Sequence, residues 1–463
     1  MEIYDFHYIL YPKNMKHILI LGAGMVSKPV VDYLLDNKFQ VTLADADVSK
    51  AASVIGRREH GNAVALDAQN QNVVENLVKA HDIIVSLLPY AFHPTVAKQC
   101  IRHRKNMVTA SYVKPEMQTL DKEAREAGII ILNELGLDPG IDHISAMKII
   151  DNVHEKGGKI KEFYSFTGAL VAPEAAGNPL RYKFTWAPQG VVAAANNDAQ
   201  YLLQGKTIRL ETEALFKNPI NCDFPQIGKL EVYPNRDSLK YIDLYGIPET
   251  QSIYRGTFRY PGWCEIMDDI KKLGLLSREK RNRKNQTYTG LISELIGEEN
   301  SRNIPEKTAQ YLGKSPGSPA LKALEWLGMF ENEIIAETGI SPFKALTKRM
   351  MEKMMISEED RDMVVMQHTF LAAYQDGKKE MIKSRLLEYG SLKTDTAVAR
   401  TVGLPAAIGV KLISEGRIKL KGVEIPLKRD IYQPILTELQ KLGIALSEET
   451  SKWDKNKKLF HGD

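Results

Sequence analysis

Residues 17–27 read HILILGAGMVS, and this stretch decides the fold of the first part of the chain. The apolar run 17–21 predicts a buried strand, because strands that are covered on both faces show no alternation with polar residues. The small residues after it predict a tight turn into a helix, and Ser27 is small enough to let that helix pack closely on the strand. The fold is therefore expected to begin with a strand, a turn and a helix.

The turn at 22–26 has the composition of a phosphate-binding loop. Gly22 permits the sharp turn, and Gly24 lets a pyrophosphate approach the backbone. The amides of Met25 and Val26 are expected to point at phosphate oxygens from the N-terminus of the helix. A glycine turn kept only for packing is the alternative, but the strand–turn–helix context favours a dinucleotide site.

Apolar runs and amphipathic helices alternate through the first third of the chain. This alternation predicts an α/β fold with a parallel sheet and crossover helices, the doubly wound Rossmann arrangement. The later predicted strands are 40–44, 63–66, 83–87, 107–109 and 129–132, and the predicted helices include 26–35, 71–80 and 94–104.

The pattern changes after residue 140. A helix over 141–155, a strand over 160–166 and turn-rich, strand-like sequence to about 262 predict a second, α+β domain. Strands are expected again at 363–375 and 383–390, and Gly403-Leu404-Pro405 is expected to open a helix with Pro405 near its first position. The predicted segments are an N-terminal extension (1–14), a dinucleotide-binding domain (15–140), a substrate-binding α+β domain (141–264), a helical insertion (265–360), return strands (361–400) and C-terminal helices packing back towards the first domain (401–463).

Composition narrows the class of protein. The chain is 43% hydrophobic and 26% charged with a net charge of +4, which is typical of a soluble globular protein and gives no general attraction to nucleic acid or membranes. No stretch approaches the roughly 20 apolar residues of a membrane span. Cys100, Cys222 and Cys264 have neither metal-site nor disulfide spacing, so we expect no metal and a cytoplasmic location. The basic run 277–284 lacks interleaved aromatic residues and is expected to be a solvated surface.

Two aspartates end predicted strands of the first domain. A carboxylate at Asp45 can accept hydrogen bonds from the adenosine ribose and repel a 2′-phosphate, and no arginine follows it. This favours NAD as cofactor, with NADP as the alternative. Capping of the next helix is the other role open to Asp45. Asp67 is expected either to lie near the adenine or to cap a helix.

Three loops at the carboxyl ends of later strands are expected to converge on the nicotinamide. The first contains Ser86 and Leu87, the second is Ser111-Tyr112, and the third runs over 136–143. Asp138 is expected to project from the third loop, although it could instead cap the helix after it. Asp142 and His143 have simpler roles open to them, as a carboxylate at the helix dipole and a polar neighbour.

Several longer motifs are distributed along the chain. They are LPYAFHPTVAKQCI (88–101), NELGLDPGIDH (133–143), APEAAGNPLRYKFTW (172–186), YPNRDS (233–238) and RGTFRYPGW (255–263), followed more weakly by MVVMQHTF (363–370) and VGLPAAIGVKLISEG (402–416). In this order they resemble the glutamate-forming saccharopine dehydrogenases, also called saccharopine reductases, and the resemblance covers almost the whole chain. It implies a Rossmann domain, a second domain on a mixed sheet, a helical insertion and a homodimer.

The resemblance implies a reaction and its residues. Glutamate and 2-aminoadipate 6-semialdehyde would form an imine, and hydride from the nicotinamide would reduce it to saccharopine. Family positions for proton transfer are matched by Tyr112 and Asp138. The cofactor is implied to contact the phosphate loop and Asp45, Asp67, Ser86, Leu87, Ser111 and Leu137.

Substrate contacts are also implied by the resemblance. Arg236 and Arg259 match carboxylate-binding positions, where a guanidinium fork suits a carboxylate, and Thr257 and Phe258 are expected beside them. Lys183 and Arg181 are weaker candidates. The chain departs from fungal members at Thr167, where they carry a cysteine, so a thiol role is absent at this substrate-binding position. It also lacks the arginine that they place near Asp45.

Two other functions share some of these sequence features. A carboxynorspermidine dehydrogenase reduces an imine made with a diamine, and a diamine would require acidic residues in place of Arg236 and Arg259. A non-catalytic NAD(P) sensor would be expected to lose Tyr112 and Asp138. The sequence therefore favours the saccharopine reaction.

Overall fold

The computed structural model describes residues 15–454 except 282–284, 300–301, 337–338 and 393–394. The predicted extension 1–14 lies outside the described residues. The chain divides into two compact units, and each is described by itself. The first holds the residues up to Ile144 together with Ala399–Gly443, and the second holds Ser145–Val398 and the residues from Ile444 onward.

The first unit is built on a seven-stranded parallel sheet in the order β15-β6-β5-β4-β1-β2-β3. The interior strand β1 is apolar and buried from Ile18 to Leu21 because helices cover both faces of the sheet, so the predicted doubly wound fold is confirmed. The strands are β1 His17–Leu21, β2 Gln40–Asp45, β3 Gly61–Ala65, β4 Ile83–Ser86, β5 Asn106–Val108, β6 Ile130–Leu132 and β15 Gly422–Glu424.

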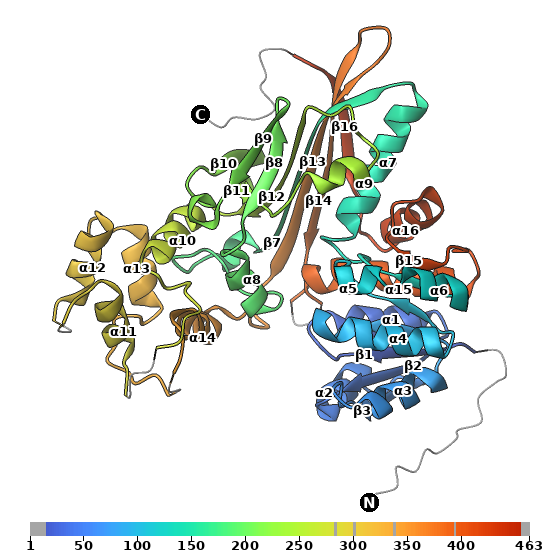
Figure 1. Cartoon of the computed structure of the whole chain (residues 1–463), viewed down its shortest axis with the longest axis horizontal. Coiled ribbons are helices and arrows are strands. Elements are labelled where there is room, and N and C mark those ends of the chain that lie inside the picture. Colours follow the sequence, from blue (N-terminus) through green and yellow to red (C-terminus); the bar gives the residue numbers. More distant parts are fainter. Residues whose placement is uncertain (1–14, 282–284, 300–301, 337–338, 393–394, 455–463) are drawn as a thin grey trace, which may run out of the picture. The chain divides into compact units, whose positions relative to one another are not determined.

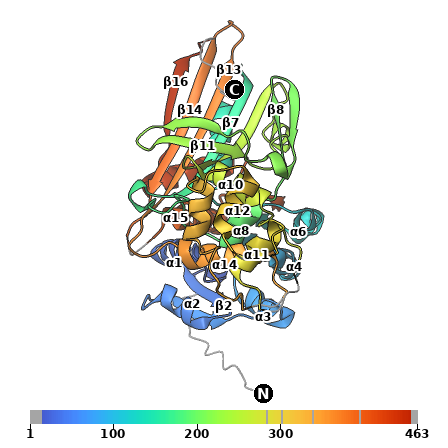
Figure 2. The ribbon, with the colours of Figure 1, turned by 90° about the vertical axis from the view of Figure 1, so that its left-hand side faces the viewer.

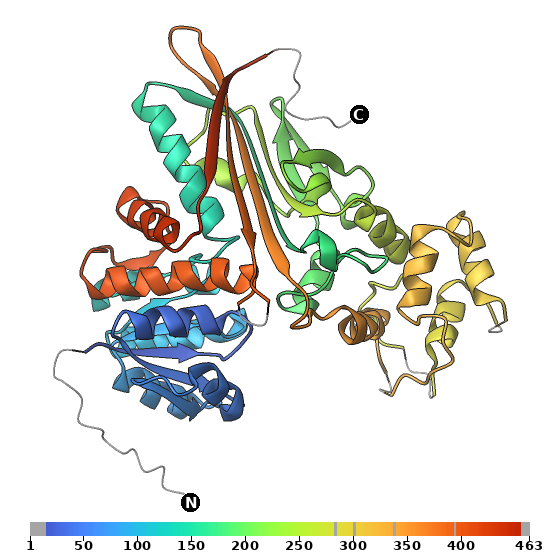
Figure 3. The same cartoon turned by 180° about the vertical axis from the view of Figure 1, so that it is seen from behind.

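Helices α1–α6, α15 and α16 surround this sheet (Figure 1). The orange helix α15 lies beside the blue helix α1 in Figure 3, and their backbones approach closely because Gly403 faces the Val26 carbonyl, where a Cβ would come within 2.8 Å. The helices are α1 Ser27–Asp36, α2 Val48–Ile55, α3 Gln71–Ala80, α4 His93–Arg102, α5 Pro115–Gln118, α6 Asp121–Ala127, α15 Ala397–Ser414 and α16 Arg429–Lys441.

The start predicted for α15 was wrong. The helix begins at Ala397 rather than near Gly403, and Pro405 lies inside it. The cause is a distant carboxylate, because buried Asp362 accepts hydrogen bonds from the amides of Ala397 at 2.7 Å and Val398 at 3.1 Å. In the described chain α15 alone is long and apolar enough to cross a membrane, but 78% of it is buried in the protein, as in a core helix.

The second unit contains a nine-stranded mixed sheet. Its main path is β10-β11-β12-β7-β13-β14-β16, in which β12 and β7 are parallel and the other pairs antiparallel. The long strands β7, β13, β14 and β16 run side by side (Figure 2). The strands are β7 Lys159–Val171, β8 Ala199–Leu203, β9 Lys206–Leu210, β10 Ile220–Phe224, β11 Gly228–Pro234, β12 Ser252–Arg259, β13 Asp362–Ala373, β14 Lys379–Tyr389 and β16 Ser447–Lys452.

The predicted helical insertion is present within this unit. Helix α7, Ile141–Glu155, precedes the sheet, and short helices α8 Pro188–Ala194 and α9 Lys240–Leu244 join its strands. The helices of the insertion are α10 Trp263–Lys272, α11 Tyr288–Leu295, α12 Ile304–Leu312, α13 Pro319–Trp326 and α14 Pro342–Met354.

The basic run 277–284 and the C-terminal segment differ in how closely they match their predictions. The described part of the basic run forms local contacts, because Arg281 pairs with Glu294 at 2.6 Å and Arg278 lies 4.8 Å from the centre of the Phe343 ring. The C-terminal segment 401–463 was predicted to supply helices, and it holds most of α15 and all of α16. It also supplies β15 and β16, which extend the two sheets at β6 and β14.

Candidate functional site

The loop after β1 has the features of a phosphate cradle. Gly22 has a φ of +105°, and an added Cβ would come within 3.2 Å of the Leu87 backbone. Gly24 is exposed, and a Cβ there would meet no atom within 4 Å, so a ligand can approach the backbone closely. Helix α1 starts at Ser27 with no side-chain cap and no acidic residue in its first turn. These features fit the pyrophosphate of a dinucleotide.

Asp45 holds this loop rather than capping a helix. Its Oδ2 accepts a hydrogen bond from the amide of Ala23 at 2.7 Å, and its Oδ1 accepts one from the amide of Asp47 at 2.9 Å. Asp47 is the residue that caps α2. The carboxylate of Asp45 thus lies at the carboxyl end of β2, beside the phosphate loop.

The other predicted cofactor residues lie in different surroundings. Asp67 is exposed and accepts a hydrogen bond from the Gln69 amide at 3.0 Å, while Asn70 caps α3. Ser86 is fully buried, and Leu137 is 6% exposed. Leu87 and Ser111 are half-buried at the carboxyl ends of β4 and β5.

Tyr112 and Asp138 meet in the first unit. The Tyr112 phenol donates a hydrogen bond to Asp138 Oδ1 at 2.6 Å, and both residues are half-buried. Gly140 makes the Asp138 loop possible, because its φ is +149° and a Cβ there would overlap the backbone of Gly136. A phenol and a carboxylate in direct contact are suited to passing a proton.

His93 was not predicted as a site residue. It lies at the start of α4, where its Nδ1 is 2.9 Å from Ser86 Oγ and its Nε2 is 2.8 Å from Ser111 Oγ. Burial lowers the pKa of His93 to about 4, so the imidazole is neutral at physiological pH. Its position in LPYAFHP, between two predicted site loops, was the available signal.

Glu134 and His143 form a second buried pair that was missed. His143 Nε2 lies 2.7 Å from Glu134 Oε2, and Glu134 Oε1 accepts a hydrogen bond from the Val113 amide at 2.9 Å. Asp142 accepts a hydrogen bond from the Gly140 amide at 2.6 Å. These residues surround the loops of Tyr112 and Asp138 with internal hydrogen bonds.

Arg259, in the second unit, is a buried cation among aromatic rings. It is only 4% exposed although it lies near the end of strand β12. Its guanidinium carbon lies 4.9 Å from the centre of the Tyr182 ring and 5.2 Å from that of Trp263. Arg259 Nη1 donates a hydrogen bond to the Phe258 carbonyl at 2.8 Å. Among the described residues, buried Arg259 Nε and Trp263 Nε1 have no hydrogen-bond partner, and no carboxylate pairs with Arg259. Unpaired buried donors of this kind suit a carboxylate ligand.

The remaining substrate candidates lie in different surroundings. Thr167 and Thr257 are register partners on parallel strands, and the buried Thr167 hydroxyl has no hydrogen-bond partner. Arg236 is exposed and has a left-handed φ of +57°. Phe258 is fully buried against Phe166, with ring centres 5.6 Å apart, so its side chain belongs to the core rather than to a binding surface.

The two weaker candidates already have partners. Lys183 pairs with Asp360 at 2.5 Å. The exposed Arg181 lies over the Tyr260 ring, 4.5 Å from its centre. Neither contact leaves a buried cation available to a ligand.

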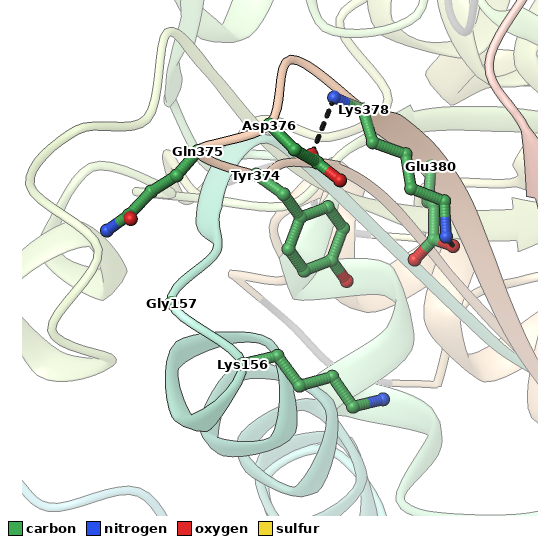
Figure 4. Close-up of a pocket in the computed structure, with 7 residues that line it drawn as sticks. All are labelled: Lys156, Gly157, Tyr374, Gln375, Asp376, Lys378 and Glu380. Atoms are coloured by element: carbon green, nitrogen blue, oxygen red, sulfur yellow. Dashed lines mark hydrogen bonds and ion pairs between the residues drawn. The ribbon is translucent and has the colours of Figure 1, made fainter.

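A separate pocket of about 430 Å³ lies where the turn between β13 and β14 meets the end of α7 (Figure 4). Three of its charged residues contact one another, because Lys378 Nζ pairs with Glu380 at 2.6 Å and the Lys378 amide donates to Asp376 at 2.9 Å. None of its lining residues was predicted as a site residue. They are Lys156, Gly157, Tyr374, Gln375, Asp376, Lys378 and Glu380. Across the described ranges, no group of three His, Cys, Asp or Glu residues could hold a metal ion.

Comparison with known families identifies two matching regions. Residues 18–132 match the family described as "Saccharopine dehydrogenase NADP binding domain", and residues 136–444 match "Saccharopine dehydrogenase C-terminal domain".

Individual relatives agree with these matches. Saccharopine dehydrogenase (NADP(+), L-glutamate-forming) of Pyricularia oryzae is 36% identical over 94% of this chain and 99% of its own length. The mitochondrial alpha-aminoadipic semialdehyde synthase of Mus musculus is 38% identical over 94% of this chain but only 48% of its own, so the chain spans about half of that relative. The apo structure of saccharopine dehydrogenase (L-Glu forming) from Saccharomyces cerevisiae has a TM-score of 0.87 at 35% identity and covers 94% of this chain and 100% of that one.

Proposed function

The chain belongs to the saccharopine dehydrogenase family, and from that premise we propose that it interconverts saccharopine with L-glutamate and 2-aminoadipate 6-semialdehyde in lysine metabolism. In the oxidative direction, hydride leaves a carbon bonded to the secondary amine and the nitrogen loses a proton, which gives an imine. Water adds to the imine, and the carbon–nitrogen bond then breaks to release both products. The nicotinamide, when bound, accepts the hydride in this direction and donates it in reverse.

The observation that carries the proposal is the hydrogen bond between Tyr112 and Asp138. Imine formation and hydrolysis require protons to move at nitrogen and oxygen, and a phenol bonded to a carboxylate can deliver or remove one. Thr167 supplies no thiol for this work. We therefore assign proton transfer to Tyr112, with Asp138 as the group that orients its hydroxyl and accepts from it.

Substrate carboxylates require cationic partners, and Arg259 is the candidate with the strongest structural support. A guanidinium that is buried among rings without a carboxylate is costly unless a ligand neutralises it. Exposed Arg236 is proposed as a second anchor, and Thr167 and Thr257, which are register partners on β7 and β12, are proposed as further substrate contacts. A diamine substrate would gain nothing from these cations, so the polyamine alternative is disfavoured.

The cofactor is proposed to be a nicotinamide dinucleotide with its pyrophosphate on Gly24, Met25 and the first turn of α1. We propose a preference for NAD, because a carboxylate at Asp45, at the carboxyl end of β2 beside the phosphate loop, would repel a 2′-phosphate. Relatives whose names specify NADP(+) are 36% identical to this chain, and the ratio of kcat/KM with NAD to kcat/KM with NADP tests the proposed preference directly.

Location and assembly stay predictions. The three cysteines are free in the structure and suit a reducing compartment such as the cytoplasm. A homodimer is proposed on the family resemblance, and size-exclusion chromatography with light scattering would test it.

The decisive experiment is a steady-state assay of the purified chain with saccharopine and either NAD or NADP, followed by the absorbance of the reduced nicotinamide. Turnover of saccharopine, with glutamate among the products, is expected. If neither saccharopine nor its two products reacted, while a semialdehyde with a diamine did, the polyamine reaction would replace this proposal.

A further inference from the structure

We propose that His93 and Glu134 are positioning residues that together form a clamp on the segment 111–113, because they hold Ser111 and Val113 in place. By fixing these two neighbours they orient the Tyr112 phenol. The inference rests on the proposed function, because it concerns the group assigned to proton transfer. Tyr112 touches Asp138 through its side chain, but its backbone lies in a short loop after β5. A loop residue that transfers a proton needs its neighbours fixed, because misplacement by about 1 Å can cost about a hundredfold in rate.

His93 holds the residue before Tyr112. Its two ring nitrogens contact Ser86 Oγ at 2.9 Å and Ser111 Oγ at 2.8 Å, so one imidazole links the loops after β4 and β5. Thr109 Oγ1 lies 3.4 Å from the same Nε2. The ring is 4% exposed and has only hydroxyls as polar contacts, so it is held as a neutral bridge.

Glu134 holds the residue after Tyr112. Its carboxylate accepts a hydrogen bond from the Val113 amide at 2.9 Å, and its own amide donates to the Ser111 carbonyl at 3.1 Å. The other carboxylate oxygen is 2.7 Å from His143 Nε2, in the first turn of α7. The segment 111–113 is thus tied to α4 through His93 and to the Asp138 loop and α7 through Glu134.

The clamp contacts the residues on either side of Tyr112. His93 contacts Ser86, Thr109 and Ser111, and Glu134 contacts the backbone of Ser111 and Val113 and the ring of His143. Both residues therefore act through Ser111 and Val113, and a defect in either should lower kcat while the substrate KM changes little.

The experiment compares His93→Gln with His93→Asn. The glutamine amide can occupy the place of Nε2 and keep the contact to Ser111, whereas the asparagine amide can occupy the place of Nδ1 and keep only the contact to Ser86. We expect His93→Gln to retain kcat within about threefold and His93→Asn to lose about tenfold to a hundredfold, with the KM for saccharopine similar in both. Thermal melting of the two variants controls for stability. Equal kcat in the two variants at equal stability would overturn the proposal.

A second readout separates the clamp from the reaction. Fluorotyrosine is incorporated into the whole chain, and the fluorine NMR signal of Tyr112 is identified by its loss in Tyr112→Phe. We expect this signal to shift or broaden in His93→Asn and in Glu134→Ala, but to stay in place in His93→Gln. An unchanged signal in His93→Asn and Glu134→Ala would overturn the clamp. If wild type did not turn over saccharopine yet the signal moved as expected, the proposed function alone would fail.

Discussion

The Tyr112 phenol lies 2.6 Å from Asp138 Oδ1, although the two residues are carried by loops that follow different strands. Tyr112 follows β5, and Asp138 follows β6, which is its parallel neighbour. Parallel neighbours present their carboxyl ends at one edge of the sheet, so residues far apart in sequence are brought into contact there. This contact is the basis of the proton-transfer assignment.

Tyr112→Phe removes the hydroxyl and leaves the ring. We expect kcat for saccharopine oxidation to fall by about a hundredfold or more, because general acid–base groups contribute about that much. The dissociation constant of the reduced cofactor, measured by its fluorescence, should change little. Tyr311→Phe is the matched control, since Tyr311 lies in α12 and is 52% exposed. A Tyr112→Phe variant with near wild-type kcat would remove Tyr112 from the mechanism.

Asp45 tests the cofactor preference. We expect kcat/KM with NAD to exceed kcat/KM with NADP. Asp45→Ala should reduce the ratio of these two values, because it removes a charge that repels a 2′-phosphate. Asp47→Ala, two residues later, removes the cap of α2 and controls for loss of a nearby carboxylate. A wild-type ratio that favours NADP would show that Asp45 does not select the cofactor.

Arg259→Lys retains the charge and loses the guanidinium fork. A charge-assisted hydrogen bond contributes about 1.5–3 kcal/mol, so the KM for saccharopine should rise about tenfold to a hundredfold. Arg259 is buried whereas Arg236 is exposed, so Arg236→Lys should have the smaller effect. Arg181→Lys, on an exposed arginine, is the control. If only the KM for the cofactor changed in Arg259→Lys, the carboxylate role would be abandoned.

Local sequence was sufficient for much of the fold. Strand β1 and helix α3 have the predicted bounds, because their apolar periodicity is strong and each is bounded by turn or capping residues. Helix α15 was missed at its start because its cap, Asp362, belongs to β13. A local sequence pattern cannot indicate a hydrogen bond whose acceptor lies on a strand that is distant in the sequence.

The residues of the candidate site were likewise predictable only where the signal is local in the sequence. The phosphate loop and Asp138 lie in compact motifs, so residue type and spacing were enough to select them. His93 and Glu134 were missed because their partners, Ser111 and the Val113 amide, belong to other elements. The surroundings of Arg259 were missed because the Tyr182 and Trp263 rings come from outside its strand.

Thr167→Val separates a ligand contact from a structural one. The buried hydroxyl has no partner among the described residues, so replacing it with a methyl group of similar size should leave the melting temperature unchanged or raise it. If the hydroxyl binds substrate, the KM for saccharopine should rise in the same variant. Thr185→Val is the control, because the Thr185 hydroxyl is also buried and unpartnered but was not predicted to bind substrate. Equal KM values in the two variants would remove Thr167 from the binding site.

His93 should make stability depend on pH. Burial lowers its pKa to about 4 in the folded chain, whereas an unfolded histidine has a pKa near 6.5, so between these values the unfolded chain binds more protons. Stability from this residue is therefore fully present above about pH 6.5 and is lost as the pH falls towards 4. The loss in free energy of unfolding approaches about 3 kcal/mol. The pKa of His93 differs between the folded and unfolded chain by more than two units, and each unit corresponds to about 1.4 kcal/mol.

The measurement is the urea midpoint of wild type and His93→Gln at a series of pH values. We expect the advantage of wild type to shrink on acidification from about pH 7 to 4, because glutamine does not titrate in this range. His60→Gln, on an exposed turn residue, controls for the loss of an imidazole. A constant difference between wild type and His93→Gln over that range would mean that His93 is not held neutral by burial, and the bridge between Ser86 and Ser111 would then need a different physical account.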